Sequence, residues 1–262
     1  MLVDSHCHLH LLDLPPTHEH LAPILQRAKA NGVEHMLCVA TALEEYAVLT
    51  ELAARYSQLS LSIGIHPTHA PAQVFSQQQL LSLARHPKVV AIGETGLDYF
   101  RSNEALTWQQ ARFAMHIEVA QHCQKPLIIH SRAAKQDTLH FLNQAYHANV
   151  NGVMHCFTED WAMAKQAIDK GFLISFSGIV TFKNATTVQE VARKIPLSQM
   201  LVETDSPYLA PVPWRGKPNE PAYVRLVAQS IAQLRNESLD NIIAQTGQNF
   251  LRLFFQGAPL PV

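Results

Sequence analysis

Short apolar segments alternate with longer amphipathic ones along the whole chain, and this order limits the possible folds more than any other feature. Eight apolar segments have the length of β-strands, and they cover residues 2–7, 34–40, 59–65, 89–93, 126–130, 152–156, 172–176 and 199–204. Their Val, Ile and Leu content is typical of strands that are buried on both faces. Strands that alternate with helices predict consecutive βαβ units and therefore a parallel sheet.

Segments with helical periodicity separate these strands. They cover residues 20–31, 43–56, 108–124, 133–148, 160–171 and 188–195, and a long helical tail covers residues 222–255. We expect one domain over residues 1–262 that folds as a (β/α)8 TIM barrel, because such barrels have about 250 residues. The alternative is an open doubly wound sheet. That fold normally has a glycine-rich phosphate loop after its first strand, where this chain has His6-Cys7-His8.

The composition excludes some classes of protein. Hydrophobic residues make up 47% of the chain and charged residues 16%, so the chain can form a large core and is not disordered. A net charge of −1 argues against a protein that coats long nucleic acids through a generic basic surface. A phosphodiester substrate remains compatible with this charge, because bound metal ions can supply the positive field.

The sequence contains few signals that indicate where in the cell the protein is located. The first residues turn polar at Asp4, which argues against a signal peptide, and no apolar run approaches the roughly 20 residues of a membrane span. The four cysteines are widely spaced and form no CxxC pair, which favours small buried hydrophobes over disulfides. We expect a cytoplasmic protein without membrane association and without an obligate protein partner.

Six of the eight predicted strands end in residues that can bind metals or transfer protons. The motifs are Asp4-Ser-His-Cys-His8, Gly64-Ile-His-Pro67, Gly93-Glu-Thr-Gly-Leu-Asp98, His130-Ser-Arg132, His155-Cys-Phe157 and Glu203-Thr-Asp-Ser-Pro207. The carboxyl ends of barrel strands meet at one face, and the active sites of TIM barrels lie there. The pattern therefore predicts one polar site at the barrel mouth.

Histidines are the first candidate metal ligands. His6 and His8 are two residues apart on a predicted strand, so both imidazoles point to the same side. His130 and His155 end two neighbouring strands. A single histidine at a strand end is more often a hydrogen-bonded structural residue, but four of them favour a site for Zn, Mn, Fe or Ni.

Two carboxylates complete the predicted site. Glu94 follows the fourth strand, between the first strand and the fifth and sixth, and is a natural bridge between two ions. Asp205 ends the eighth strand, which lies beside the first when the barrel closes, so it can bind an ion and hold or deprotonate a water. A turn or helix-capping carboxylate is the alternative for each. Glu203 is a candidate support for a ligand histidine.

Substrate contacts are less specific in the sequence. Arg132 can clamp a phosphate or carboxylate, although a structural ion pair fits equally well. Arg215 and Lys217 lie in a proline-rich cationic loop after the eighth strand, where substrate contact and a solvated connector are both plausible. His66 and Asp98 are weaker candidates for the same rim.

In these motifs the chain resembles the TatD family of metal-dependent hydrolases, a branch of the amidohydrolase-like barrels. The resemblance runs from the Asp4 motif to the Arg215-Gly-Lys-Pro-Asn-Glu-Pro221 segment and covers nearly the whole chain. It implies deoxyribonuclease activity that depends on divalent metal, often as a 3′-to-5′ exonuclease on single strands. It also implies Glu94 as a bridge and metal ligands at His6, His8, Glu94, His130, His155 and Asp205.

The expected mechanism uses two divalent ions that clamp a scissile phosphate and activate a water, with Asp205 and Glu94 as the catalytic carboxylates. DNA is the expected partner, bound locally through its phosphates. The resemblance implies Mg2+ in assays, whereas four histidines favour Zn2+ or Mn2+ as the bound ions. Two alternatives remain: hydrolysis of a carbon centre such as a lactone, amide or aminoacyl ester, and a non-catalytic binding protein on a degenerate barrel.

Overall fold

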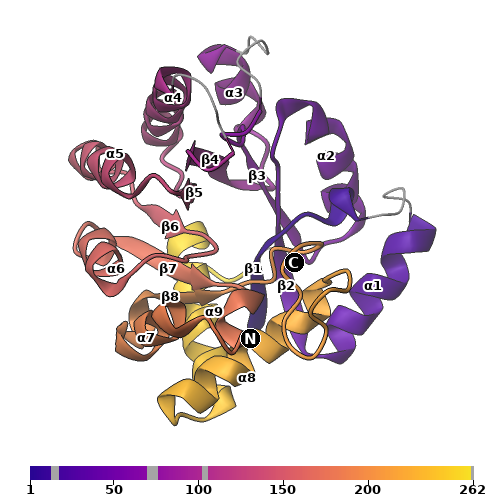
Figure 1. Ribbon diagram of the computed structural model, residues 1–262. Coiled ribbons are helices and arrows are strands. Elements are labelled where there is room, and N and C mark those ends of the chain that lie inside the picture. The colour runs from indigo at the N-terminus through magenta and orange to yellow at the C-terminus, as the bar shows by residue number, and fades with distance from the viewer. Residues whose placement is uncertain (13–17, 70–75, 102–105, 261–262) are drawn as a thin grey trace.

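The computed structural model describes residues 1–12, 18–69, 76–101 and 106–260. Eight strands form one sheet in which each strand pairs in parallel with the next one along the chain (Figure 1). They are β1 (Leu2–Cys7), β2 (Val33–Val39), β3 (Leu59–Ile63), β4 (Val89–Asp98), β5 (Leu127–Arg132), β6 (Gly152–Met154), β7 (Phe172–Phe176) and β8 (Met200–Val202).

Backbone hydrogen bonds join the first strand to the segment after the last. The Asp205 N–H donates to the carbonyl oxygen of His6 at 2.9 Å, and the His8 N–H donates to the carbonyl oxygen of Ser206 at 2.7 Å. Cys7 and Ser206 form a parallel bridge between them. These bonds close the sheet at its mouth, and the predicted (β/α)8 barrel is confirmed.

Helices surround the barrel (Figure 1). They are α1 (His18–Ala30), α2 (Tyr46–Arg55), α3 (Gln77–Leu83), α4 (Thr107–Cys123), α5 (Lys135–His147), α6 (Trp161–Ile168), α7 (Thr186–Lys194), α8 (Val224–Arg235) and α9 (Leu239–Phe255). Short 3-10 turns are η1 (Leu9–Leu11), η2 (Leu43–Glu45), η3 (Gly178–Thr181), η4 (Leu197–Gln199) and η5 (Pro221–Tyr223). Among these described helices, none has both the length and the apolar character required to cross a membrane.

Two helices differ from the prediction by more than a shift of their ends. Helix α3 was not predicted, although its capping box can be read in the sequence: Ser76 Oγ accepts from the Gln79 N–H at 3.1 Å, and Gln79 Oε1 accepts from the Ser76 N–H at 2.9 Å. The predicted single tail helix is wrong. It breaks at Asn236, which adopts a left-handed φ of 54°, and α9 begins after its N-cap Ser238.

Several strand ends also differ from the prediction, and two of these differences bear on the site. β4 continues to Asp98 instead of ending at residue 93, because residues 95–98 pair with β5. β8 ends at Val202, so Asp205 lies in the loop after the strand. Periodicity could not define either end, since the length of a strand depends on which residues of the neighbouring strand pair with it.

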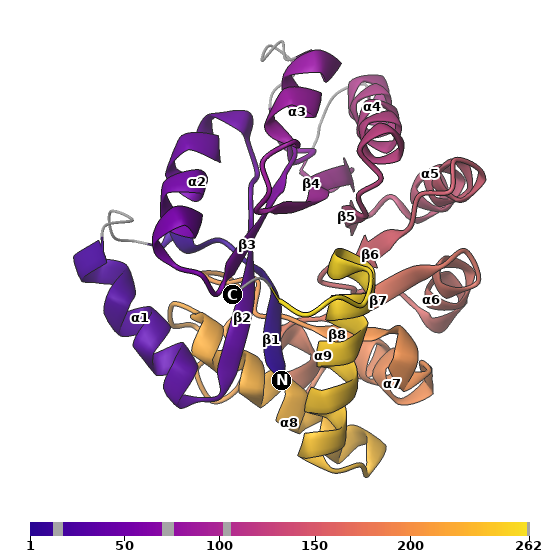
Figure 2. The same ribbon diagram turned by 180° about the vertical axis from the view of Figure 1, so that it is seen from behind.

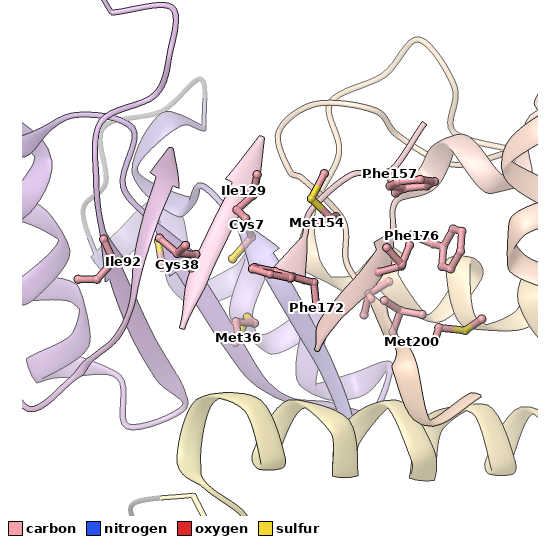
Figure 3. Packing of buried hydrophobic residues seen from close by; sticks show 14 of the residues in the cluster. Cys7, Met36, Cys38, Ile92, Ile129, Met154, Phe157, Phe172, Phe176 and Met200 are labelled. Carbon is pink, nitrogen blue, oxygen red and sulfur yellow. The ribbon is translucent and has the colours of Figure 1, made fainter. Parts of the chain in front are cut away.

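The main hydrophobic core lies between the strands and the surrounding helices. Figure 3 shows part of it, with Ile92, Ile129, Met154 and Phe172 from four successive segments of the barrel in one cluster. The same cluster includes Phe113 of α4. This layer explains why the strands are apolar throughout, since each one packs against helices on its outer face.

A second apolar cluster closes the amino-terminal end of the barrel. Inward-facing residues such as Val3, Leu37 and Ile128 pack against Phe250 and Leu253 of α9. Figure 2 shows α9 lying across this end of the barrel. Because one end is sealed by apolar side chains, a polar site can open only at the other end, where the strands finish.

Close backbone approach fixes the pairing of β4 with β5. Gly96 has a φ of 132°, and a Cβ added to it would overlap the carbonyl oxygen of His130. Glycine alone allows both this conformation and this contact. The extension of β4 that carries Glu94 and Asp98 therefore depends on a missing side chain.

We expect Gly96→Ala to lower the free energy of unfolding by about 2 kcal/mol or more, because backbone strain adds to steric overlap. Chemical denaturation would measure the change. The matched control is Gly171→Ala, where φ is 85° and no atom lies within 4 Å of an added Cβ. This control should lose only about 1 kcal/mol. Equal losses in the two variants would contradict the argument.

A buried imidazole connects α4 to the end of β3. His116 Nδ1–H donates to the Arg112 carbonyl at 2.8 Å, and its Nε2 accepts from the Ile65 N–H at 3.2 Å. Both nitrogens are satisfied only in the neutral ring, since protonation would set two N–H groups against each other. Burial lowers the pKa of His116 to about 4.

We expect His116 to make the free energy of unfolding sensitive to acid. The unfolded chain binds a proton at His116 below about pH 6.5 and the folded chain does not, so stability falls from that pH toward pH 4. His116→Gln keeps one donor and one acceptor without titrating. We expect it to reduce the slope of unfolding free energy against pH by up to about 1.4 kcal/mol per unit. The exposed His140→Gln should keep the wild-type slope, and an unchanged slope in His116→Gln would refute the assignment.

Candidate metal centre

β1 delivers two imidazoles to the barrel mouth. The pairing of β1 with β2 shifts register between Asp4 and Cys7, and such irregularities commonly re-aim side chains. The Nε2 atoms of His6 and His8 lie 3.1 Å apart. His8 Nδ1–H donates to the Val39 carbonyl at 2.8 Å, which leaves Nε2 with its lone pair directed into the site.

Asp205 reaches the same point from the opposite end of the chain. Its Oδ1 lies 3.4 Å from His8 Nε2 and 3.7 Å from His6 Nε2. Asp205 has a φ of 58°, a left-handed conformation that aspartate tolerates better than most residues. The backbone bond to the His6 carbonyl holds it there, so its position follows from barrel closure.

Glu94 faces this group with one carboxylate oxygen. Its Oε2 lies 3.5 Å from His6 Nε2 and 3.8 Å from His8 Nε2. Together with Asp205, these side chains present two nitrogens and two oxygens around one point.

The other oxygen of Glu94 faces a second group of imidazoles. Glu94 Oε1 lies 2.9 Å from His155 Nε2, 3.0 Å from His130 Nδ1 and 3.4 Å from His66 Nε2. His66, which the sequence placed at the rim, thus lies within the cluster, beside Glu94. One carboxylate stands between two sets of donor atoms, in the arrangement expected of a bridge.

The donor spacing fits divalent cations. Four ligands placed tetrahedrally at about 2.0–2.1 Å from a metal are about 3.3–3.4 Å apart. The distances among His6, His8 and Asp205 run from 3.1 to 3.7 Å. Three groups of converging donors have all their atoms within 4.8 Å of one another: His6-His8-Asp205, His66-Glu94-His130 and His6-His155-Glu203.

Two further carboxylates orient the predicted ligand histidines. Glu203 Oε1 accepts from His155 Nδ1 at 3.2 Å and from the Cys156 N–H at 2.7 Å. Asp98 Oδ2 lies 3.2 Å from His130 Nε2. The sequence placed Glu203 in this supporting role but assigned Asp98 only to the rim, because the extension of β4 was not visible.

The charges of the cluster are strongly coupled. Burial would raise the pKa of Glu94, but neighbouring imidazoles, His155 first, hold it well below its usual range. Burial would lower the pKa of His155, but Glu94 and Glu203 hold it well above its usual range. Without a cation, protons on the histidines with raised pKa values, His8, His130 and His155, balance the carboxylates. A bound metal replaces those protons, so metal binding releases them.

Asp4 has a structural position beside the cluster. Its buried carboxylate accepts from the Thr204 N–H at 2.8 Å and from the Thr204 hydroxyl at 2.6 Å. Burial raises the pKa of Asp4 to about 8. These bonds tie β1 to the segment that carries Asp205, which explains a carboxylate in this motif without assigning it a metal.

A cavity of about 800 Å³ opens over the cluster. Arg101 and Arg132 line it, whereas Arg215 and Lys217 are not among its described lining residues. The Arg215 guanidinium lies 4.4 Å from the Phe182 ring, and Lys217 Nζ lies 5.3 Å from the Trp214 ring. The position of Arg101 could not be predicted, since nothing in the local sequence shows that this residue lines the cavity.

The chain is similar to known proteins over nearly its full length. A family model described as TatD related DNase matches residues 3–255. The uncharacterized metal-dependent hydrolase YcfH of Escherichia coli is 45% identical over 253 residues, which cover 97% of this chain and 95% of that protein. A Mycobacterium tuberculosis protein, the uncharacterized metal-dependent hydrolase TatD, is 35% identical over 98% of both chains. The crystal structure of the TatD homolog YjjV from E. coli superposes with a TM-score of 0.90 at 30% identity and covers 98% of both chains.

We expect Glu203→Gln to weaken Zn2+ binding by about 10-fold, because the neutral amide no longer raises the basicity of His155. Competition with a chromophoric chelator would measure the affinity. Glu190→Gln on the exposed face of α7 is the matched control, where only a surface pair with Lys194 is lost. An affinity unchanged from wild type in Glu203→Gln would rule out this supporting role.

Proposed function

We propose that this chain, which belongs to the TatD family of metal-dependent hydrolases, is a deoxyribonuclease that shortens single-stranded DNA from its 3′ end. The observation that carries the proposal is the Glu94 carboxylate, whose two oxygens face separate groups of metal-ligating side chains. Two ions that share a carboxylate are typical of enzymes that hydrolyse phosphodiesters by in-line displacement.

The donor set supports two divalent ions held by six residues, with Glu94 common to both. His6, His8 and Asp205 would hold one ion, and His130 and His155 the other. Imidazole nitrogens favour Zn2+ or Mn2+ as resident ions, since Mg2+ prefers oxygen ligands. When bound, such ions polarise a phosphoryl oxygen and lower the pKa of water. His66 lies close enough to Glu94 to contribute to the second group.

Asp205 is suited to handle the proton of the attacking water. Burial would raise its pKa, but His8, His155 and His6 keep it below its usual value, so the side chain is a carboxylate at neutral pH. It lines the cavity and can therefore reach a substrate. A carboxylate in this position can orient a water and accept its proton as the phosphodiester is cleaved.

Two arginines at the rim can neutralise phosphate oxygens. Arg132 and Arg101 both line the cavity that contains Glu94 and Asp205. The planar fork of arginine matches a phosphate group in two hydrogen bonds. A local cationic rim also reconciles a net charge of −1 with a DNA substrate, because the charge is needed only near the scissile bond.

The test uses Asp205→Asn and a 5′-labelled single-stranded oligonucleotide. We expect the variant to retain bound metal and to lose about 100-fold or more in kcat, because the amide cannot accept the proton. The wild-type enzyme should produce a ladder that shortens progressively from the 3′ end. Gel analysis of the products and elemental analysis of the protein give the two readings.

The control variant is Asp169→Asn at the C-cap of α6, where an exposed aspartate pairs with Lys165. It should keep the wild-type rate. Full activity in Asp205→Asn, or in wild-type protein stripped of metal, would contradict the mechanism. Hydrolysis of lactones or esters by wild-type enzyme that leaves the oligonucleotide intact would instead assign the site to carbon centres.

A further inference from the structure

The cavity over the metal centre has two walls of opposite character. Arg101 and Arg132 line it from the ends of β4 and β5. The loops after β7 and β8 contribute Ile179, Tyr208 and Leu209. Because the strands follow one another in order around the barrel, β4 and β5 lie across from β8 and β1 (Figure 1). Arg101 and Arg132 therefore come from the side of the mouth opposite the segment after β8, which carries Tyr208 and Leu209, and Ile179 follows the neighbouring strand β7.

The apolar wall is held rigidly. Leu209 has a φ of 56°, a strained conformation for a bulky residue, and such strain is concentrated at functional sites. A Cβ added to Gly178 would overlap the carbonyl oxygen of Leu209, so the two loops are in close contact. The Asn219 side-chain amide donates to the carbonyl of Tyr208 at 2.6 Å and to that of Thr204 at 2.9 Å.

Tyr208 presents a ring beside the metal centre. Its ring centroid lies 6.2 Å from that of His8, in an edge-on arrangement, and the residue is 53% exposed. A large aromatic side chain so exposed at the lip of a polar cavity does not serve the core. It offers a flat apolar face to whatever occupies the cavity.

Hydrogen bonds and a ring contact also hold the cationic wall in place. Asp98 Oδ1 accepts from the N–H groups of Phe100 and Arg101, at 3.1 and 2.9 Å. The Arg132 guanidinium lies 4.0 Å from the centroid of the Phe100 ring. These contacts keep positive charge at the rim on the side opposite Tyr208.

We infer, as an extension of the proposed function, that Tyr208, Leu209 and Ile179 form a nucleobase subsite and that Arg101 and Arg132 bind a neighbouring phosphate. A nucleotide carries a planar, largely apolar base on one side of its sugar and an anionic phosphate on the other, which matches the two walls. Stacking on an aromatic side chain accepts every base, because each has a π-face. The subsite therefore holds single-stranded DNA without reading its sequence.

The test compares two single-stranded thymidine oligonucleotides that differ only in whether the last two 3′ residues carry bases or are abasic. We expect wild-type enzyme to prefer the base-containing strand roughly 10-fold in kcat/KM. Tyr208→Ala should reduce this ratio to less than about 2, and Tyr208→Phe should keep it. A merely structural role of Tyr208 would lower both rates and leave the ratio unchanged. Tyr146→Ala on α5, an exposed aromatic away from the mouth, should also keep the ratio.

Substitution of the two arginines is expected to change the salt dependence of DNA binding instead. Arg101→Gln and Arg132→Gln should weaken both strands equally and lower the slope of log affinity against log salt by about one each, because a phosphate contact is lost. Arg55→Gln, on the outer surface at α2, should keep the wild-type slope. Equal salt slopes in all three variants would overturn the phosphate subsite.

Binding separates failure of the subsite from failure of the proposed function. Fluorescence anisotropy with Asp205→Asn protein measures the affinity for both strands without cleavage. Equal affinities, or a base preference that survives Tyr208→Ala, would overturn the nucleobase subsite. A base preference in binding by a wild-type enzyme that cleaves neither strand would support the subsite and contradict the nuclease proposal.

Discussion

The site depends on the backbone hydrogen bonds that close the barrel between β1 and the segment after β8. The bonds from Asp205 N–H to the His6 carbonyl and from His8 N–H to the Ser206 carbonyl hold together residues about 200 positions apart in the sequence. The Asp4 carboxylate strengthens the same seam through two hydrogen bonds from Thr204. These hydrogen bonds involve the backbone of His6, His8 and Asp205, whose side chains form the first donor group. The geometry of the metal site therefore depends on closure of the barrel. A change that opens the seam would lose both.

Glu94 is the electrostatic centre of the molecule. It is buried among five imidazoles, and its two oxygens divide them into a group from β1 and a group from the ends of β3, β5 and β6. A buried carboxylate surrounded by bases is costly unless charges are balanced. Protons on the histidines provide that balance without metal, and cations provide it when bound. Metal affinity, protonation and local stability are consequently linked, and Asp98 and Glu203 set the orientation of His130 and His155 within that balance.

The fold separates stability from chemistry along the barrel axis. Apolar side chains and α9 seal one end, so the core there is independent of the site. At the other end, loops of unequal character rise around the metal centre, with Arg101 and Arg132 on one side and Tyr208 and Leu209 on the other. The central cluster is suited to hydrolysis in general, while the walls determine which molecules can approach it. This division explains how closely similar metal centres on one fold can serve different substrates.

The sequence by itself determined the alternation of strands and helices, the barrel and the candidate metal ligands, because periodicity and strand-end position are local properties of the chain. It placed Glu94 and Asp205 beside the histidines through one topological rule, that the strand ends of a barrel meet at its mouth. Only the tertiary structure decided that β4 extends to Asp98, that His66 belongs to the cluster, and that Arg101 and Tyr208 face the cavity. It also placed Arg215 and Lys217 against aromatic rings. These features depend on how loops from distant segments pack against each other, and no local pattern encodes such contacts.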